Sequence, residues 1–153
     1  MAEQVSCSCA GGDKSRIIFP CCGQANTGQI SNAAAIQLDE EGYGAYACTA
    51  LLVSSETLAK RATEVDEVVA IDGCGMACAK KIADSAGVTV HQHLVITDLG
   101  VEKKSGDRLF TKEEVESIAS AAWKGEGEVK ESDSEKKKPS GGSGGCGCSG
   151  KCS

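Results

Sequence analysis

Short apolar runs alternate with amphipathic segments along the first 124 residues of the chain. Four of these runs have the length and composition of buried strands, at residues 16–20, 45–52, 67–72 and 93–100. Four segments with helical spacing follow them, at about residues 27–41, 55–64, 73–87 and 111–123. Because a helix follows every strand, the strands are predicted to be parallel. The expected fold class is α/β, a small three-layer sandwich with a four-stranded, mostly parallel sheet and helices on both faces.

The character of the chain changes at both ends. Residues 1–15 form a polar N-terminal segment with a Cys-x-Cys pair, Cys7 and Cys9, and residues 16–124 form the expected α/β metal-binding domain. Residues 125–153 carry charge blocks and then Gly and Ser, with little to bury, so we expect a disordered linker and a Gly/Cys-rich tail. Three further cysteines lie at the end of this tail, namely Cys146, Cys148 and Cys152.

Composition argues against several classes of partner. The 153 residues include 22 acidic and 16 basic side chains, and a net charge of −6 disfavours a nucleic-acid surface. The N-terminus lacks the apolar run of a secretory signal, and no apolar stretch approaches the roughly 20 residues that cross a bilayer. We therefore expect a cytoplasmic protein with neither a nucleic-acid nor a membrane partner. The sequence does not identify a protein partner.

Ten cysteines are many for this length, and in a reducing compartment clustered thiols favour metal or redox chemistry over structural disulfides. Cys21 and Cys22 follow the first predicted strand, and Cys48 lies late in the second. Cys74 and Cys78 follow the third strand, at a spacing that would place both on one face of a helix. Ligands bind at the carboxyl ends of parallel strands, so these thiols are predicted to converge on a metal ion there.

Backbone groups near these cysteines fit a negatively charged metal centre. Two predicted helices begin beside the thiols, and a helix N-terminus lowers the pKa of a thiol and so favours the thiolate that binds metal. Glycine-rich turns at Gly23, Gly73 and Gly75 could supply N–H donors to the sulfurs.

Two other readings of the loop after the first strand fail on its residues. Gly23 and Gly28 have the spacing of a phosphate-binding loop, but Gln29 and Ile30 stand where Lys and Ser/Thr are required. A cysteine phosphatase needs an arginine six residues after its nucleophile, and Thr27 and Gly28 occupy those positions. We predict no catalytic residues in this loop.

Histidines do not enter the predicted ligand set. His91 precedes the fourth predicted strand and His93 begins it, so we expect both at the amino end of the sheet, as surface or strand-end residues. Asp98 lies at the carboxyl end, where we expect it to cap or bond locally. No acid, base and nucleophile constellation is visible elsewhere, which argues against an enzyme. The remaining catalytic alternative is a site in which Asp72 or Asp98 acts beside an open metal position.

Several ordered motifs resemble the DGC-domain family, which is named for an Asp-Gly-Cys at the end of its third strand. They are "FPCCGQANTGQISNAAA", Cys48, "AIDGCGMACAKKIADSAG" and "ITDLG", and they fall within about residues 7 to 122. The resemblance implies a zinc-binding protein with four characteristic cysteines, here Cys21, Cys48, Cys74 and Cys78. It also implies that an early Cys-x-Cys pair is a common accompaniment. Cys22 stands where a small residue is expected, so either Cys21 or Cys22 could be the ligand.

The expected function is zinc binding by thiolates at the carboxyl end of the sheet. Accessory cysteines could add handling of soft metals or metalloids, since one zinc ion needs only four thiolates. The alternative is an iron–sulfur or thiol-redox protein. Besides the four cysteines of the resemblance, the further candidates for ligands are Cys22, Cys7 and Cys9.

Overall fold

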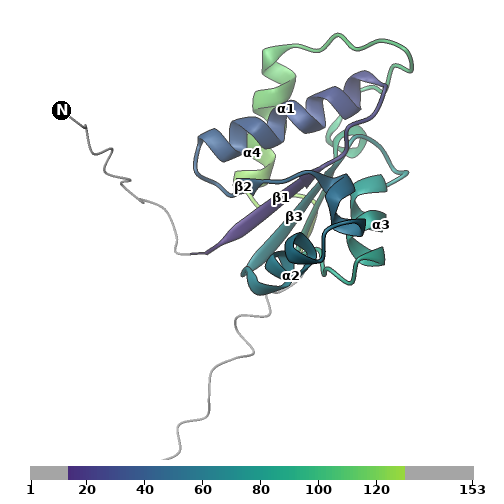
Figure 1. Cartoon of the computed structure of the whole chain (residues 1–153). Helices are drawn as coiled ribbons and strands as arrows, with labels where there is room; N and C mark the ends of the chain where they lie inside the picture. The colour runs from purple at the N-terminus through teal and green to yellow at the C-terminus, as the bar shows by residue number, and fades with distance from the viewer. Residues whose placement is uncertain (1–13, 130–153) are drawn as a thin grey trace, which may run out of the picture.

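The computed structural model describes residues 14–129, which form an α/β fold of three layers (Figure 1). The sheet has the strand order β2-β1-β3-β4-β5, in which the first four strands are parallel and β5 is antiparallel to β4. The strands are β1 (Arg16–Pro20), β2 (Ala45–Tyr46), β3 (Glu67–Asp72), β4 (Gln92–Val95) and β5 (Glu128–Val129).

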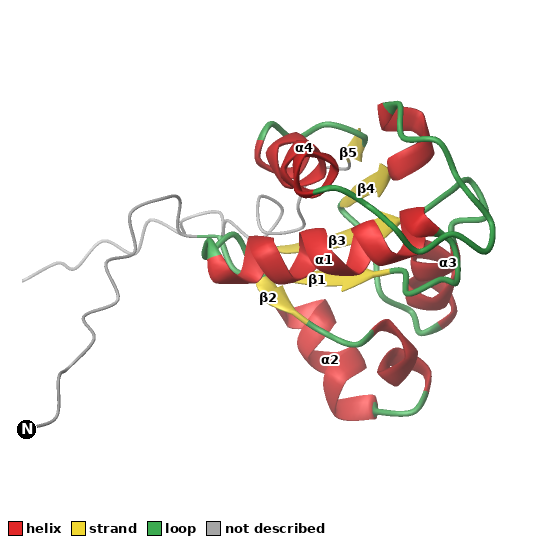
Figure 2. Cartoon of the chain, turned by 90° about the horizontal axis from the view of Figure 1, so that it is seen from above, coloured by secondary structure: helices red, strands yellow, loops and turns green. Residues whose placement is uncertain are grey.

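Helices cover both faces of this sheet, and the predicted fold class is confirmed (Figure 2). Helices α1 and α4 pack on one face, while α2, α3 and the 3₁₀ helix η1 pack on the other. The helices are α1 (Asn26–Glu40), η1 (Thr49–Val53), α2 (Glu56–Glu64), α3 (Cys78–Ser85), η2 (Ile96–Leu99) and α4 (Lys112–Trp123). Within residues 14–129, no helix has the length and apolar character needed to cross a membrane.

Alternate strand residues build two separate apolar layers. Ile18 and Val69 point into the core under α1 and α4, whereas Phe19 and Val68 point into the core under α2 and α3. Because successive side chains of a strand leave on opposite faces, burial of both faces requires an apolar residue at nearly every position. This explains why β1 and β3 appear in the sequence as continuous apolar runs.

Strand β2 is much shorter than the predicted strand at residues 45–52. It pairs with β1 only through Ala45 and Tyr46, and then the chain enters η1. Pro20 at the end of β1 has no N–H to continue the ladder on this side. The Pro20 carbonyl accepts a hydrogen bond from the Thr49 hydroxyl instead, at 2.6 Å. The apolar run at 45–52 therefore continues as a 3₁₀ helix rather than a strand.

Helix α3 starts five residues later than the predicted helix at 73–87. Residues 73–77 form a turn in which the Ala77 N–H donates to the Cys74 carbonyl at 3.0 Å. Ala77 itself has φ 50°, a left-handed conformation that costs a residue with a Cβ about 1 kcal/mol or more. Cys74 thus lies in the turn and Cys78 opens the helix, so the prediction that both share one helix face is wrong.

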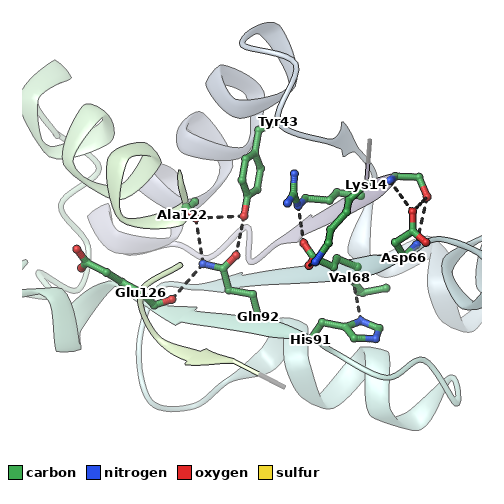
Figure 3. Close-up of polar contacts among 11 residues, drawn as sticks. Lys14, Tyr43, Asp66, Val68, His91, Gln92, Ala122 and Glu126 are labelled. Atoms are coloured by element: carbon green, nitrogen blue, oxygen red, sulfur yellow. Dashed lines mark hydrogen bonds and ion pairs between the residues drawn. The ribbon is translucent and has the colours of Figure 1, made fainter. Parts of the chain in front are cut away.

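The ordered sheet extends past the boundary predicted at residue 124, because Glu128–Val129 form β5 beside β4. A buried network holds this extension near the amino end of the sheet (Figure 3). The Tyr43 hydroxyl lies 2.6 Å from Gln92 Oε1, and Gln92 Nε2 donates to the carbonyls of Ala122 and Glu126. The remainder of the predicted linker and tail lies outside the described residues.

Candidate metal centre

The candidate site lies at the carboxyl ends of β1 and β3. The chain leaves β1 toward β2 on one side and leaves β3 toward β4 on the other, so the strand order reverses between them. A crevice at such a reversal is the usual ligand site of an open parallel sheet. Cys21 directly follows β1, and Cys74 lies two residues after β3.

Five cysteines surround two adjoining clefts at this end of the sheet. One cleft, of about 220 Å³, is lined by Cys21, Cys74 and Cys78 among other residues. The second, of about 320 Å³, is lined by Cys21, Cys22, Cys48 and Cys78. Cys21 and Cys78 therefore border both clefts, and the loops after β1, β2 and β3 each contribute at least one thiol. All five cysteines are free thiols.

The thiols surround the clefts without forming a finished coordination sphere. Within residues 14–129, no three His, Cys, Asp or Glu side chains are grouped closely enough to hold a metal ion. Thiolates around one zinc ion would each lie about 2.3 Å from the metal. Coordination of one ion by these thiols would require the side chains to rotate toward a common point. Thiolates are ligands that suit zinc, but the described side chains are not placed to coordinate one ion.

Close backbone packing joins the two loops that carry Cys21 and Cys74. A Cβ added at Gly28 would lie 2.4 Å from the backbone nitrogen of Gly23, a distance that real Cβ atoms essentially never show. A Cβ at Gly73 would lie 2.9 Å from the Gly28 nitrogen. These glycines are needed because backbone meets backbone at both points. The loop after β1 is thereby fixed against the turn after β3.

Cys21 is anchored through its backbone, and its thiol is partly buried. Its N–H lies 2.8 Å from the Ile71 carbonyl oxygen and 3.1 Å from Ser31 Oγ. Burial raises the pKa of the Cys21 thiol, an effect that the Gly73 backbone N–H opposes and the negative charge of Asp72 reinforces. The Gly73 N–H thus supplies the predicted hydrogen bond from a glycine-rich turn to the Cys21 sulfur, but the pKa of this thiol is still raised overall.

Cys22 and Cys48 are neighbours in the second cleft. Partial burial raises the pKa of Cys22, and the proximity of Cys48 raises it further. The expectation that helix N-termini lower these thiol pKa values is therefore wrong for Cys21 and Cys22. Cys48 is exposed and precedes η1, so its predicted position inside a strand is also wrong. Cys48 nevertheless lies at the carboxyl end of the sheet, as predicted.

Cys74 has a basic neighbour that sequence analysis did not identify. Lys103 Nζ lies 3.3 Å from Cys74 Sγ. The loop that carries this lysine is held by buried Asn26, whose side chain donates to the Glu102 carbonyl and accepts from the Lys104 N–H. The sequence around residue 103 contains no motif that signals this contact. It depends on the docking of a loop onto the first residue of α1.

Asp72, the Asp of the Asp-Gly-Cys motif, organises the turn between β3 and α3. It is only 1% exposed and accepts hydrogen bonds from the backbone N–H groups of Ala79 and Lys80, at 2.7 and 3.1 Å. His93 Nε2 lies 2.9 Å from Asp72 Oδ2, the oxygen that also accepts from the Lys80 N–H. A carboxylate at the N-terminus of α3 satisfies backbone donors that the helix itself cannot. Asp72 therefore fixes the start of α3, where Cys78 lies.

Both histidines are buried, and one of them differs from its predicted position. His93 is buried, 6% exposed, and reaches the carboxyl end of the sheet through Asp72, so its assignment as a surface or strand-end residue is wrong. His91 does lie at the amino end, but it is also buried, and its Nδ1 accepts from the Val68 N–H at 3.0 Å. Asp98 is exposed in the first turn of η2. The candidate ligands Cys7 and Cys9, and the three tail cysteines, lie outside the described residues.

Comparison with known proteins gives two matches. The family model described as DGC domain matches residues 17–122. A curated relative from Pseudomonas aeruginosa, the anaerobic and virulence modulator AnvM, is 27% identical over 92 residues, which cover 60% of this chain and 70% of the relative. No solved structure matches the chain.

Proposed function

The chain belongs to the DGC-domain family, and from this premise we propose that it binds a zinc ion through cysteine thiolates at the carboxyl end of its sheet. The proposed ligands are Cys21, Cys48, Cys74 and Cys78. The observation that carries the proposal is the arrangement of free thiols from three separate loops around two adjoining clefts. Family membership supports a metal-binding role in general, and the thiols favour zinc among divalent ions.

The surroundings of the thiols suit the charge of such a centre. Zinc with four thiolates carries a formal net charge of −2, which needs nearby donors or cations. The Gly73 N–H and the Lys103 ammonium group already contact Cys21 and Cys74, respectively. Closing four thiolates around one ion would tie the loop after β1 to the turn after β3. A structural zinc site can contribute on the order of 10–16 kcal/mol of apparent binding free energy.

Zinc titration of the full chain under anaerobic, reducing conditions tests this function, with a chromophoric chelator as competitor. The wild-type chain should hold one tightly bound zinc ion. Cys78→Ser should lose it, because Cys78 borders both clefts. Cys7→Ser is the matched control and should keep the tight ion. Unchanged tight binding by Cys78→Ser would refute the proposed site.

Accessory cysteines would extend this function to the transfer of soft metals. On this proposal Cys7 and Cys9, with the three tail cysteines, form a looser thiol site that acquires or releases the ion. Removing residues 130–153 should then leave one tightly held zinc ion per chain. Loss of that ion on truncation would show that the tail supplies ligands to the core.

An iron–sulfur or thiol-redox function is the second candidate. The described residues hold five thiols in adjoining clefts, one more than zinc requires, and four cysteines can also hold a cluster. Absorption separates the two functions directly, because a cluster protein purified without oxygen is brown and a zinc protein is colourless. A brown chain with stoichiometric iron and sulfide would favour the cluster.

A further inference from the structure

Cys22 is a thiol in the second cleft that the proposed zinc ligands do not use. It directly follows Cys21, is exposed, and its Sγ lies 3.3 Å from Asn32 Oδ1. The Tyr46 hydroxyl donates to the same oxygen at 2.9 Å. These contacts hold Cys22 at the second cleft, on the side of Cys48.

The two clefts divide the thiols unequally. Cys21 and Cys78 border both, Cys74 borders only the first, and Cys22 and Cys48 border only the second. The second cleft alone therefore presents four thiols, which is a complete set for tetrahedral zinc. The first cleft presents three. A set of four thiols that includes Cys74 must therefore take its fourth member from the second cleft.

We propose that Cys22 creates a second metal position that overlaps the first, with Cys21, Cys48 and Cys78 shared and either Cys22 or Cys74 as the fourth ligand. This inference rests on the proposed zinc function and assigns a role to the thiol that the family's set of four leaves out. In the exchange, the bond from the metal to Cys74 Sγ breaks and a bond to Cys22 Sγ forms. The proton that Cys22 loses is taken up by Cys74, so the charge of the protein and its metal is unchanged.

Each alternative ligand has a stabilising contact when it is not bound. Cys74 has Lys103 Nζ at 3.3 Å, and Cys22 has Asn32 Oδ1 as an acceptor for its S–H. The geometry thus suits a site in which one ligand leaves as another enters.

Cobalt(II) titration of the full chain tests this exchange, because the sulfur-to-cobalt charge-transfer band grows with the number of bound thiolates. The variants are Cys22→Ser, Cys74→Ser and the double variant. Zinc affinities are then measured by chelator competition, and circular dichroism checks that each variant is folded. Both single variants should give the four-thiolate spectrum of the wild type, with zinc affinity reduced by no more than about tenfold.

The double variant should lose the four-thiolate spectrum, and its zinc affinity should fall by over ~100-fold. This loss of affinity is larger than the loss expected when a residue that only hydrogen-bonds to a metal ligand is removed. A three-thiolate spectrum from Cys74→Ser alone would overturn the inference and leave the zinc site of the family's four cysteines standing. A four-thiolate spectrum from the double variant would also overturn it, since a cysteine outside the two clefts would then be the substitute. Failure of the proposed function itself appears separately, as unchanged binding by Cys78→Ser.

Discussion

Replacing Asp72 by asparagine should destabilise the domain strongly, although the two side chains have nearly the same shape. The carboxylate accepts from the N–H groups of Ala79 and Lys80 and contacts His93, and it is almost fully buried. Asparagine keeps one acceptor oxygen and places an amide N–H₂ group where the other oxygen was. At least one of the two backbone N–H groups would then face the N–H₂ group, which is also a donor, and would lose its acceptor. A hydrogen bond to a charged group contributes about 1.5–3 kcal/mol, and a buried donor without an acceptor costs about 1–3 kcal/mol. We therefore expect a loss of about 2–4 kcal/mol.

Urea unfolding of the metal-free chain at pH 7 under reducing conditions measures this loss, with linear extrapolation to water. Asp98→Asn is the matched control, because Asp98 is exposed near the same end of the sheet, and it should change stability by no more than about 0.5 kcal/mol. A zinc titration of Asp72→Asn should also show affinity reduced by about 10–100-fold, since the start of α3 positions Cys78. An Asp72→Asn variant as stable as the Asp98→Asn control would refute the role assigned to this carboxylate.

Two further predictions concern the backbone and the pH dependence of stability. Gly28→Ala should cost about 1–3 kcal/mol in urea unfolding despite the higher helix propensity of alanine, because its Cβ would meet backbone at 2.4 Å. Gly75→Ala, with open space around it, is the control, and equal stability of the two variants would contradict the packing argument. Glu67→Gln should cost about 0.2–1 kcal/mol at pH 7, since burial raises the pKa of Glu67 but its ion pairs with Lys14 and Arg16 lower it overall. Because the pKa of Glu67 is lowered in the folded state, its ionised carboxylate stabilises the fold at pH values above the unfolded pKa of about 4.3, and this contribution is lost as the pH falls through the folded pKa. In denaturation curves, the stabilities of wild type and variant should therefore converge as the pH falls below the unfolded pKa. A difference that persists in acid would argue against these ion pairs.

The sequence predicted the architecture well because local patterns specify it. Strands buried on both faces must be apolar at nearly every position, as β1 and β3 are, and helices between them force the strands to be parallel. The placement of cysteines after two predicted strands and late in a third then predicted their position at the carboxyl end of the sheet. That inference needed only the order of elements and no contact between side chains.

Errors arose where contacts between distant residues decide the local structure. The end of β2 depends on Pro20 of the neighbouring strand, which lacks the N–H needed for further pairing. The late start of α3 depends on Asp72, which accepts from the first backbone donors of the helix. The burial of His93 depends on the register of β4 against β3, where it pairs opposite Ala70. None of these contacts leaves a periodic or compositional signal in the segment that it alters.

X-ray absorption at the zinc edge tests the central claim most directly, because it reports the atoms bound to the metal. The full chain, loaded with one zinc ion under anaerobic conditions, should show four sulfurs at about 2.3 Å. Cys78→Ser should show fewer sulfurs or retain no tightly bound zinc, because its thiol borders both clefts. A wild-type shell of nitrogen and oxygen, or a four-sulfur shell that persists in Cys78→Ser, would contradict the account.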